Sequence, residues 1–138
     1  MKVDIILKAL HVTANVFWVG AIVAVAVIMV ADAGDAKTRG AIAQRVYLRA
    51  AVPGFVASFL AGTGRLALDA SVYMKQGWFH AKLLFILIVI ALHHVIGGKA
   101  KKMAKGDAED AGKTGTLAIA LAVAAGLAAF VAVWRFGK

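Results

Sequence analysis

Four long runs of apolar residues limit what this chain can fold into. They lie at about 5–31, 50–68, 78–97 and 116–134. A helix needs roughly 20 mainly apolar residues to cross the hydrocarbon core of a bilayer, and each run is about that long. Because backbone amides find no hydrogen-bond partners in lipid, the runs are predicted to be helices and not strands. We therefore expect an all-α fold, a four-helix transmembrane bundle.

The composition supports a membrane protein and excludes several kinds of site. Hydrophobic residues make up 62% of the 138 residues and charged residues 17%, which is too apolar for an ordinary soluble domain. We expect one integral membrane domain over 1–138, with the lipid bilayer as its main partner. The absence of cysteine excludes disulfides, thiolate metal sites and a cysteine nucleophile. A small-residue face on the last run favours close helix packing and a homo-oligomer: Ala118, Ala122, Gly126 and Ala129.

Basic residues are concentrated in two connections between the apolar runs, 32–49 and 98–115. These residues are Lys37, Arg39, Arg45, Arg49, Lys99, Lys101, Lys102, Lys105 and Lys113. By the positive-inside rule, both loops are predicted to be cytoplasmic and both termini outside, in a multi-pass protein of the inner membrane. The net charge of +9 then reflects membrane topology and not nucleic-acid binding.

Several ionisable residues lie inside or at the edge of apolar runs. Burying such a group at membrane depth costs about 2.5–3.5 kcal/mol on insertion scales, so each is a candidate for function. The predicted topology brings six of them toward one leaflet: Lys8, His11, Arg65, His80, Lys82 and Arg135. On the first run, four residues recur at three- and four-residue intervals: Lys8, His11, Asn15 and Trp18. This spacing predicts one helix face, turned toward the bundle interior.

Histidine is the residue type in this cluster that indicates a cofactor. Imidazole is a common ligand of metals and haem, and histidines on facing helices bind cofactors in the cores of bundles. His11 and His80, expected at similar depth, would form a bis-histidine haem site or one ligand with a proton-transfer group. Three residues would form a cationic rim for porphyrin propionates: Lys8, Arg65 and Lys82. Four aromatic residues are near enough in the sequence to flank a flat ligand: Phe17, Trp18, Trp78 and Phe79.

The same residues allow other interpretations. The lysines and arginines lie close enough to helix ends to extend their charges to the membrane surface. In a metal-handling or transport protein without haem, the ligands of copper or zinc would be His11, His80 and His94. A third interpretation is a small structural subunit whose histidines are incidental. His93 is expected to face headgroups or a loop.

Three segments resemble the HemJ-type protoporphyrinogen IX oxidases, a family of small four-helix membrane proteins. They are KALHVTANVFWVGAI at Lys8–Ile22, QRVYLRAAVPGF at Gln44–Phe55 and GWFHAKLLFILIVIALHH at Gly77–His94. The resemblance extends over nearly the whole chain, and GW-x-H-x-K is its most specific element. Two features depart from the family. His93 stands where an aromatic is usual, and Ala24–Ala31 replaces a polar and aromatic patch.

The resemblance implies a membrane oxidoreductase that carries haem b and converts protoporphyrinogen IX to protoporphyrin IX in haem biosynthesis. Its electron acceptor would be a quinone or another component of the respiratory chain. His11 is implied as the leading axial ligand, and His80 as the second ligand or proton acceptor. Lys82 is implied as a contact to the substrate or a propionate, and His94 matches the family's second histidine on the third helix. The alternative of a metal-handling protein corresponds to the copper-resistance D family, a remote relative with a similar four-helix core.

Overall fold

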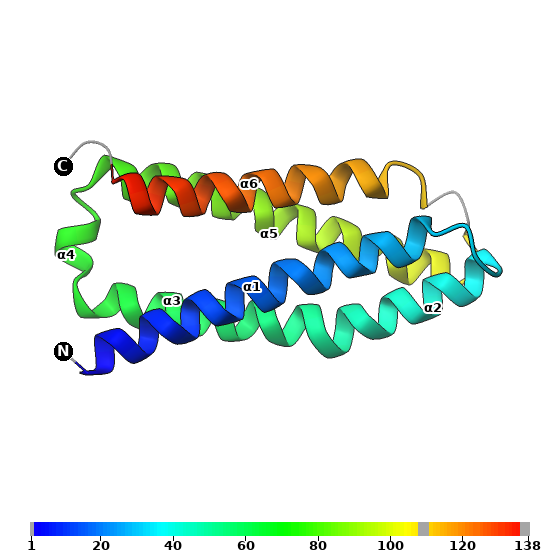
Figure 1. Ribbon diagram of the computed structural model, residues 1–138, viewed down its shortest axis with the longest axis horizontal. Helices are drawn as coiled ribbons and strands as arrows, with labels where there is room; N and C mark the ends of the chain where they lie inside the picture. Colours follow the sequence, from blue (N-terminus) through cyan, green and yellow to red (C-terminus); the bar gives the residue numbers. More distant parts are fainter. Residues whose placement is uncertain (1, 108–110, 136–138) are drawn as a thin grey trace.

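The computed structural model, described here for residues 2–107 and 111–135, is an antiparallel bundle of long helices (Figure 1). Its elements are α1 (Lys2–Val30), α2 (Ala36–Val46), the π-helix η1 (Tyr47–Ala51), α3 (Val52–Leu68), α4 (Ala70–Tyr73), α5 (Gly77–Ala104) and α6 (Thr114–Trp134). No strand occurs in these two ranges. Four spans, one of them combining α2, η1 and α3, are long and apolar enough to cross a membrane. The prediction of an all-α, four-helix bundle is confirmed.

The second span begins well before its apolar run. The sequence predicts a loop over 32–49, but a helix starts at Ala36 and continues through η1 into α3. Asp35 caps this helix, because its carboxylate accepts hydrogen bonds from the Thr38 backbone N–H at 2.9 Å and the Thr38 hydroxyl at 2.6 Å. These bonds hold the pKa of Asp35 below its ordinary value. The loop prediction was wrong here because basic residues lower hydropathy without opposing helix formation.

The third span also outlasts its apolar run, since α5 continues to Ala104. The connection between α5 and α6 is therefore shorter than the loop predicted over 98–115. The helix ends where Gly106 adopts a φ of 107°. The N–H groups of Gly106 and Asp107 donate to the carbonyls of Met103 and Lys102 at 3.0 and 3.3 Å. This is a Schellman motif, which satisfies carbonyls of the last helical turn.

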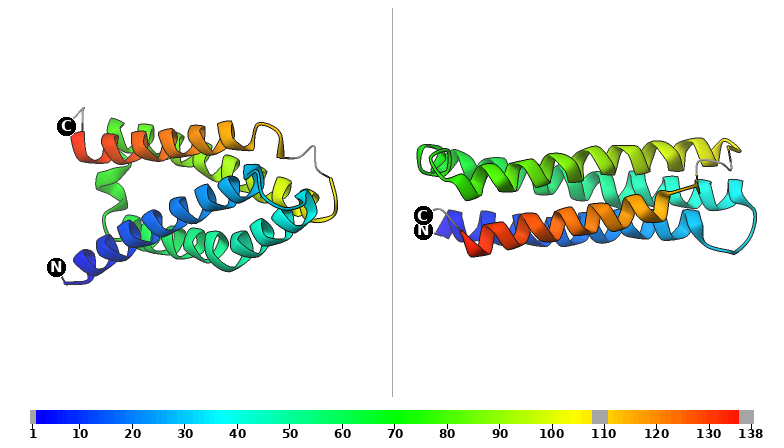
Figure 2. Two further views of the ribbon diagram at one scale, coloured as in Figure 1. Left: turned by 45° about the vertical axis from the view of Figure 1, so that its right-hand side comes forward. Right: turned by 90° about the horizontal axis from the view of Figure 1, so that it is seen from above.

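The bundle is closed at one end and open at the other (Figures 1 and 2). We call these the loop end, with the α1–α2 and α5–α6 connections, and the terminal end, with Lys2, α4 and Arg135. Helix α3 packs mainly along α1, and α5 along α6. At the loop end α2 packs against α5 and joins the two pairs. At the terminal end the pairs diverge, and α4 lies across the gap between them.

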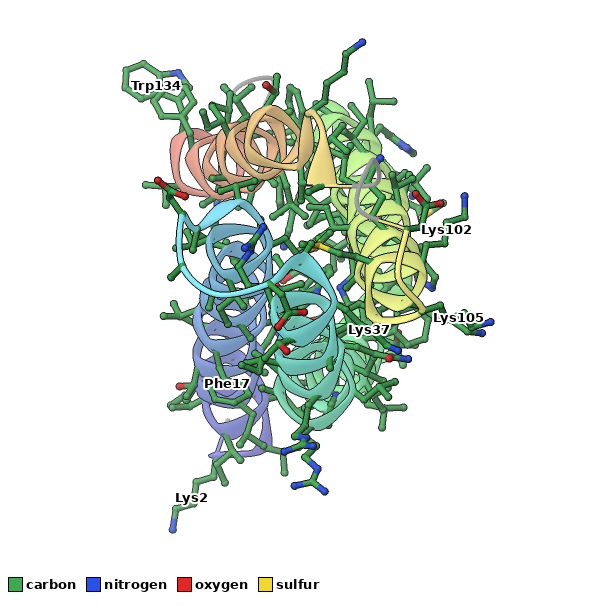
Figure 3. All side chains as sticks on the ribbon, turned by 90° about the vertical axis from the view of Figure 1, so that its right-hand side faces the viewer. Lys2, Phe17, Lys37, Lys102, Lys105 and Trp134 are labelled. Carbon is green, nitrogen blue, oxygen red and sulfur yellow. The ribbon has the colours of Figure 1, made fainter. Side chains whose placement is uncertain are left out.

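The main core fills the half of the bundle nearer the loop end. Its fully buried side chains include Ile22, Val25, Met29, Val89, Ile96, Met103 and Leu121. Many other apolar side chains face outward. Phe17 and Trp134, for example, are 55% and 68% exposed, and Trp134 points away from the bundle (Figure 3). An apolar exterior of this extent suits lipid and not water.

The second span is longer than a bilayer requires. Its 33 residues extend about 50 Å, whereas the hydrocarbon core is about 30 Å thick. The first turns of α2 therefore project beyond the core at the loop end, together with the end of α5. Lysines cover this projection, and Lys37, Lys102 and Lys105 lie there in Figure 3. The loop end is thus the basic end of the molecule.

Gly40 allows α2 and α5 to meet in this projection. A Cβ atom at Gly40 would overlap the backbone of Met103 and Ala104, whereas one at Gly98 would meet nothing within 4 Å. Because backbone cannot move aside as a side chain can, Gly40→Ala is expected to lower the free energy of unfolding by about 1–3 kcal/mol. Gly98→Ala should be neutral or stabilising, since alanine favours helix. Thermal unfolding in detergent compares them, and equal stabilities would contradict this packing.

Candidate functional site

A cavity of about 560 Å³ lies where the two helix pairs diverge at the terminal end. Its volume is within the range of small-molecule and cofactor sites. The polar residues in its wall are Lys8, His11, Asn15, Ser58, Thr63, Arg65, Lys82 and Arg135. Four exposed apolar side chains also line it, Val12 on α1, Phe59 on α3, and Leu83 and Leu87 on α5. The cavity therefore opens sideways between α3 and α5, toward the surrounding lipid.

Helix α1 supplies the wall with the residues that helical spacing places on one face. Lys8, His11, Asn15 and Trp18 all line the cavity. Trp18, the innermost of them, is 2% exposed. The prediction that this face is turned toward the bundle interior is confirmed.

His11 is held by hydrogen bonds at both ring nitrogens. Its Nδ1 lies 2.9 Å from the backbone carbonyl oxygen of Ser58. A carbonyl only accepts, so Nδ1 carries the proton and donates it. Nε2 in turn accepts from the side-chain N–H of Asn15 at 3.1 Å. Asn15 also donates to the His11 carbonyl at 2.9 Å and accepts from the Ser58 hydroxyl at 2.8 Å. The three residues form a closed hydrogen-bonded ring that joins α1 to α3.

This ring leaves His11 in a tautomer suited to binding a metal. A histidine that donates from Nδ1 to a carbonyl has its lone pair at Nε2, and its ring is fixed in direction. A ligand that takes Nε2 displaces one hydrogen bond of Asn15, which keeps its bonds to the His11 carbonyl and to Ser58. His11 can therefore bind iron, or accept a proton, through Nε2.

Gly62 on α3 makes room for the His11 ring. A Cβ at Gly62 would lie 2.8 Å from Cε1 and 3.0 Å from Nδ1 of His11. Gly62→Ala is expected to push the ring away from the Ser58 carbonyl and to weaken a ligand bound through His11 about tenfold, the effect of one lost hydrogen bond. Gly64→Ala is the matched control, because a Cβ there meets only Leu7 at 3.6 Å. Equal affinities in a haem titration would contradict this role.

Two of the four cations around the cavity are already paired. Asp4 forms ion pairs with Lys8, at 3.1 Å, and with Arg65. Arg65 also pairs with Asp69 at 3.0 Å, and its guanidinium lies 5.1 Å from the centre of the Tyr73 ring. These contacts join α1, α3 and α4. Two of the three residues predicted to form a cationic rim, Lys8 and Arg65, are therefore neutralised by carboxylates of the protein itself.

The other two cations, Lys82 and Arg135, form no ion pair with the parts of the chain that are described, 2–107 and 111–135. Lys82 on α5 is half-buried in the cavity wall. Arg135 lies at the mouth, 5.8 Å from the centre of the Trp78 ring. A cation at membrane depth without a counter-charge is costly. Lys82 is therefore the residue of this cavity that most favours an anionic ligand.

A second cavity, of about 570 Å³, lies between α1, α5 and α6. It shares His11, Asn15, Trp18 and Lys82 with the first cavity. The rest of its wall is apolar, with small residues of α6: Ala122, Ala125, Gly126, Ala128 and Ala129. His11 and Lys82 are thus accessible from two sides.

Three of the four aromatic residues expected to flank a ligand line the first cavity. They are Trp18, Trp78 and Phe79. Phe17 instead is 55% exposed and does not line it. The cavity is thus partly walled by flat rings, as a planar ligand requires.

The structure does not bring His80 and His94 to His11. His80 Nε2 lies 2.9 Å from the Met74 carbonyl and His94 Nδ1 lies 2.9 Å from the Ile90 carbonyl, and both rings are exposed. Since they are fourteen positions apart on α5, about 21 Å separates them along the helix. No cluster of three or more His, Asp or Glu side chains able to hold a metal ion occurs among the described residues. His80 and His94 line neither of the cavities that His11 lines, and the three-histidine metal site is not formed among the described residues.

His93, which the sequence interpretation places among headgroups or loops, is buried. It is 1% exposed, and its Nδ1 accepts a hydrogen bond from the Trp18 indole N–H at 3.0 Å. Its ring centre lies 4.9 Å from that of Tyr47 and 5.3 Å from that of Phe55. The signal for this position is its register, because His93 follows Lys82 by about three helical turns on the same face.

The chain is similar to a protoporphyrinogen IX oxidase. That protein comes from Synechocystis sp. and is 29% identical over 70 residues, which are 51% of this chain and 33% of the relative. The match thus spans about one third of the length of the curated relative. No family model matches the chain, and no solved structure matches it. The comparisons give no support to a relation with the copper-resistance D family.

Proposed function

We propose that this protein is a haem-binding membrane oxidoreductase that converts protoporphyrinogen IX to protoporphyrin IX. The observation that carries the proposal is one largely apolar cavity that holds an oriented histidine, His11, beside Lys82, a lysine that forms no ion pair with the described residues. The apolar wall accepts a macrocycle, the histidine accepts its iron, and the lysine accepts its carboxylates. The similarity to the Synechocystis protoporphyrinogen IX oxidase supports the same function.

The residues of the first cavity fit haem b with a single histidine ligand. His11 would hold the iron through Nε2, because Nδ1 is bonded to Ser58. Lys82 and Arg135 would hold the propionates, with aromatic side chains against the ring. Bound haem supplies one-electron oxidation and reduction. His80 lies outside the cavity and has no role in this proposal.

The protein's own residues bind the substrate, orient it and exclude water. Protoporphyrinogen is an apolar macrocycle with propionates, so with haem in the first cavity it would enter the second from the lipid, where Lys82 is the cation in the wall. Haem and substrate need separate places, and the two cavities provide them on either side of His11 and Lys82. The apolar walls keep water from the reacting ring. Conversion to protoporphyrin removes six electrons and six protons from the substrate. Three quinone molecules would take up both, or another component of the respiratory chain would accept the electrons while the protons pass to water.

We also infer that the protein lies in the inner membrane with its loop end in the cytoplasm. The loop end carries the lysines of α2 and α5, and positively charged segments are retained on the cytoplasmic side. The terminal end, with the open cavity, then lies toward the outer leaflet. Labelling of a cysteine introduced at Gly34 or at Lys75 by a membrane-impermeant reagent tests this. Labelling of Gly34→Cys in intact cells would mean that the loop end lies outside, the opposite of the inferred orientation.

Absorption and porphyrin fluorescence test the proposed function directly. Protein expressed with an ample haem supply and purified in detergent is expected to show a Soret band. Without oxygen, it should form fluorescent protoporphyrin from protoporphyrinogen when a quinone is added, and none when the quinone is omitted. Protein that lacks a Soret band and leaves protoporphyrinogen unchanged would refute the proposal.

A further inference from the structure

Trp18 closes the inner end of both cavities. It lines both cavities, and in the first it is the lining residue of α1 nearest the loop end, whereas in the second Val19 lies one residue beyond it. The ring of Phe55, also in the first cavity, lies 5.1 Å from the Trp18 ring. The orientation of the indole therefore sets how far a macrocycle can enter from either side.

His93 holds the indole from behind. It lines neither cavity, but its ring contacts those of Trp18 and Phe55, which line the first cavity. The Trp18 N–H donates to His93 Nδ1 at 3.0 Å, so His93 is neutral with its lone pair on that atom. A buried indole N–H almost always needs an acceptor, and leaving it without one costs more than the bond itself contributes.

The fold fixes His93 from two further elements. The π-helix η1 changes the helical register between α2 and α3 and places the Tyr47 ring against His93. On α5, Gly97 lies one turn beyond His93, and a Cβ there would overlap the Tyr47 ring. Single π-turns recur at functional sites in helices. A π-turn, a glycine and a hydrogen bond thus converge on one imidazole outside the cavities.

We propose that His93 is a positioning residue: by accepting the Trp18 N–H it fixes the indole across the inner end of both cavities and so shapes them for a macrocycle. The inference rests on the proposed function for the identity of the ligand. It needs only the neutral His93 ring and its Nδ1 acceptor. His94, its exposed neighbour on α5, packs edge-on against the His93 and Phe55 rings, and its Nδ1 lies against the Ile90 carbonyl and not against Trp18.

His93→Asn and His93→Leu form a matched pair that isolates the acceptor. The two side chains have the same shape, but only asparagine offers an oxygen at the branch position that corresponds to Nδ1. With haemin or protoporphyrin IX as the probe, the leucine variant is expected to bind about tenfold more weakly than the asparagine variant. The Trp18 indole N–H resonance, assigned with Trp18→Phe, should shift in the leucine variant and exchange faster with solvent. His94→Leu should match the wild type in both measurements.

A double-mutant cycle separates this role from a loss of packing. In a Trp18→Phe background, which removes the donor, the asparagine and leucine variants should bind the probe equally. A difference that persists there would overturn the proposal, as would equal binding by the two single variants. If the leucine variant does not fold, His93→Phe, which keeps a ring but has no acceptor nitrogen, is compared with wild type in the same two backgrounds.

The indole resonance also distinguishes failure of this inference from failure of the proposed function. If wild-type protein binds neither haemin nor protoporphyrin IX, the proposed function fails. The exchange rate of the Trp18 N–H still decides whether His93 holds the indole, because that measurement needs no ligand. Equal exchange rates in the asparagine and leucine variants would overturn the role of His93.

Discussion

Replacement of His11 by alanine is expected to abolish the Soret band of the purified protein and its conversion of protoporphyrinogen. The variant removes the imidazole whose Nε2 would bind the iron and leaves Ser58 and Asn15 without their central partner. No other histidine lines either cavity in the described part of the chain. Nothing in the wall can therefore replace it as an imidazole ligand. Absorption spectra of membranes and of purified protein provide the measurement.

The exposed histidines of α5 are the controls for this result. His80→Ala and His94→Ala each remove an imidazole that bonds only to a backbone carbonyl outside the cavities. Both variants should keep the Soret band at full intensity. Loss of the band in His80→Ala, with the band retained in His11→Ala, would restore His80 as the ligand and contradict the single-histidine site.

Replacement of Lys82 by glutamine is expected to weaken porphyrin binding at least about tenfold. Lys82 forms no ion pair with the described residues, so a bound carboxylate would be its first counter-charge. Removing one member of a poorly solvated charge pair costs about 2–5 kcal/mol. Lys8→Gln should change the affinity much less, because Lys8 pairs with Asp4 and its side chain is 51% exposed. Fluorescence titration with protoporphyrin IX measures both affinities.

The dimethyl ester of the same porphyrin shows whether charge causes the effect. The ester keeps the macrocycle but has no carboxylates. Its affinity for wild type and for Lys82→Gln should therefore be equal. A loss of affinity for the ester as large as that for the acid would mean that the substitution damages the cavity wall, and the assigned role of Lys82 would be abandoned.

Periodicity and hydropathy predict most of this fold. They fail where basic residues, which indicate a loop, occur within a helix. The apolar runs locate four spans because nothing but a helix satisfies its backbone in lipid. Residues 36–49 were predicted as part of a loop, because their basic side chains hide a helix that packs on α5 at the loop end. The π-helix at Tyr47–Ala51 has no sequence signature that we recognise. It depends on how α2 and α3 both meet their neighbours.

In the candidate site, too, helical spacing predicts some residues and misses others. On α1, spacing alone placed Lys8, His11 and Asn15 on one face, and they line the cavity together. On α5, depth was used in place of angle, so His80 was grouped with His11 although it lies about 160° around the axis from Lys82, at 100° per residue. By the same measure the angle between Lys82 and His93 is small, so the two residues share one face of α5. This shared face is the sequence signal for a buried His93. The hydrogen-bond partner of His11, Ser58, lies on another helix, and the spacing within one helix does not predict such a partner.

The sideways opening between α3 and α5 leads to the apolar outer surface of the bundle. Phe59, Leu83 and Leu87 at its edge are exposed there, so acyl chains of the bilayer are expected to compete with a macrocycle for the cavity. Binding is then an exchange of one hydrophobic occupant for another. Apparent affinities should vary with the chain length of the detergent used, and shorter tails, which compete less well, should make the same protein a tighter binder.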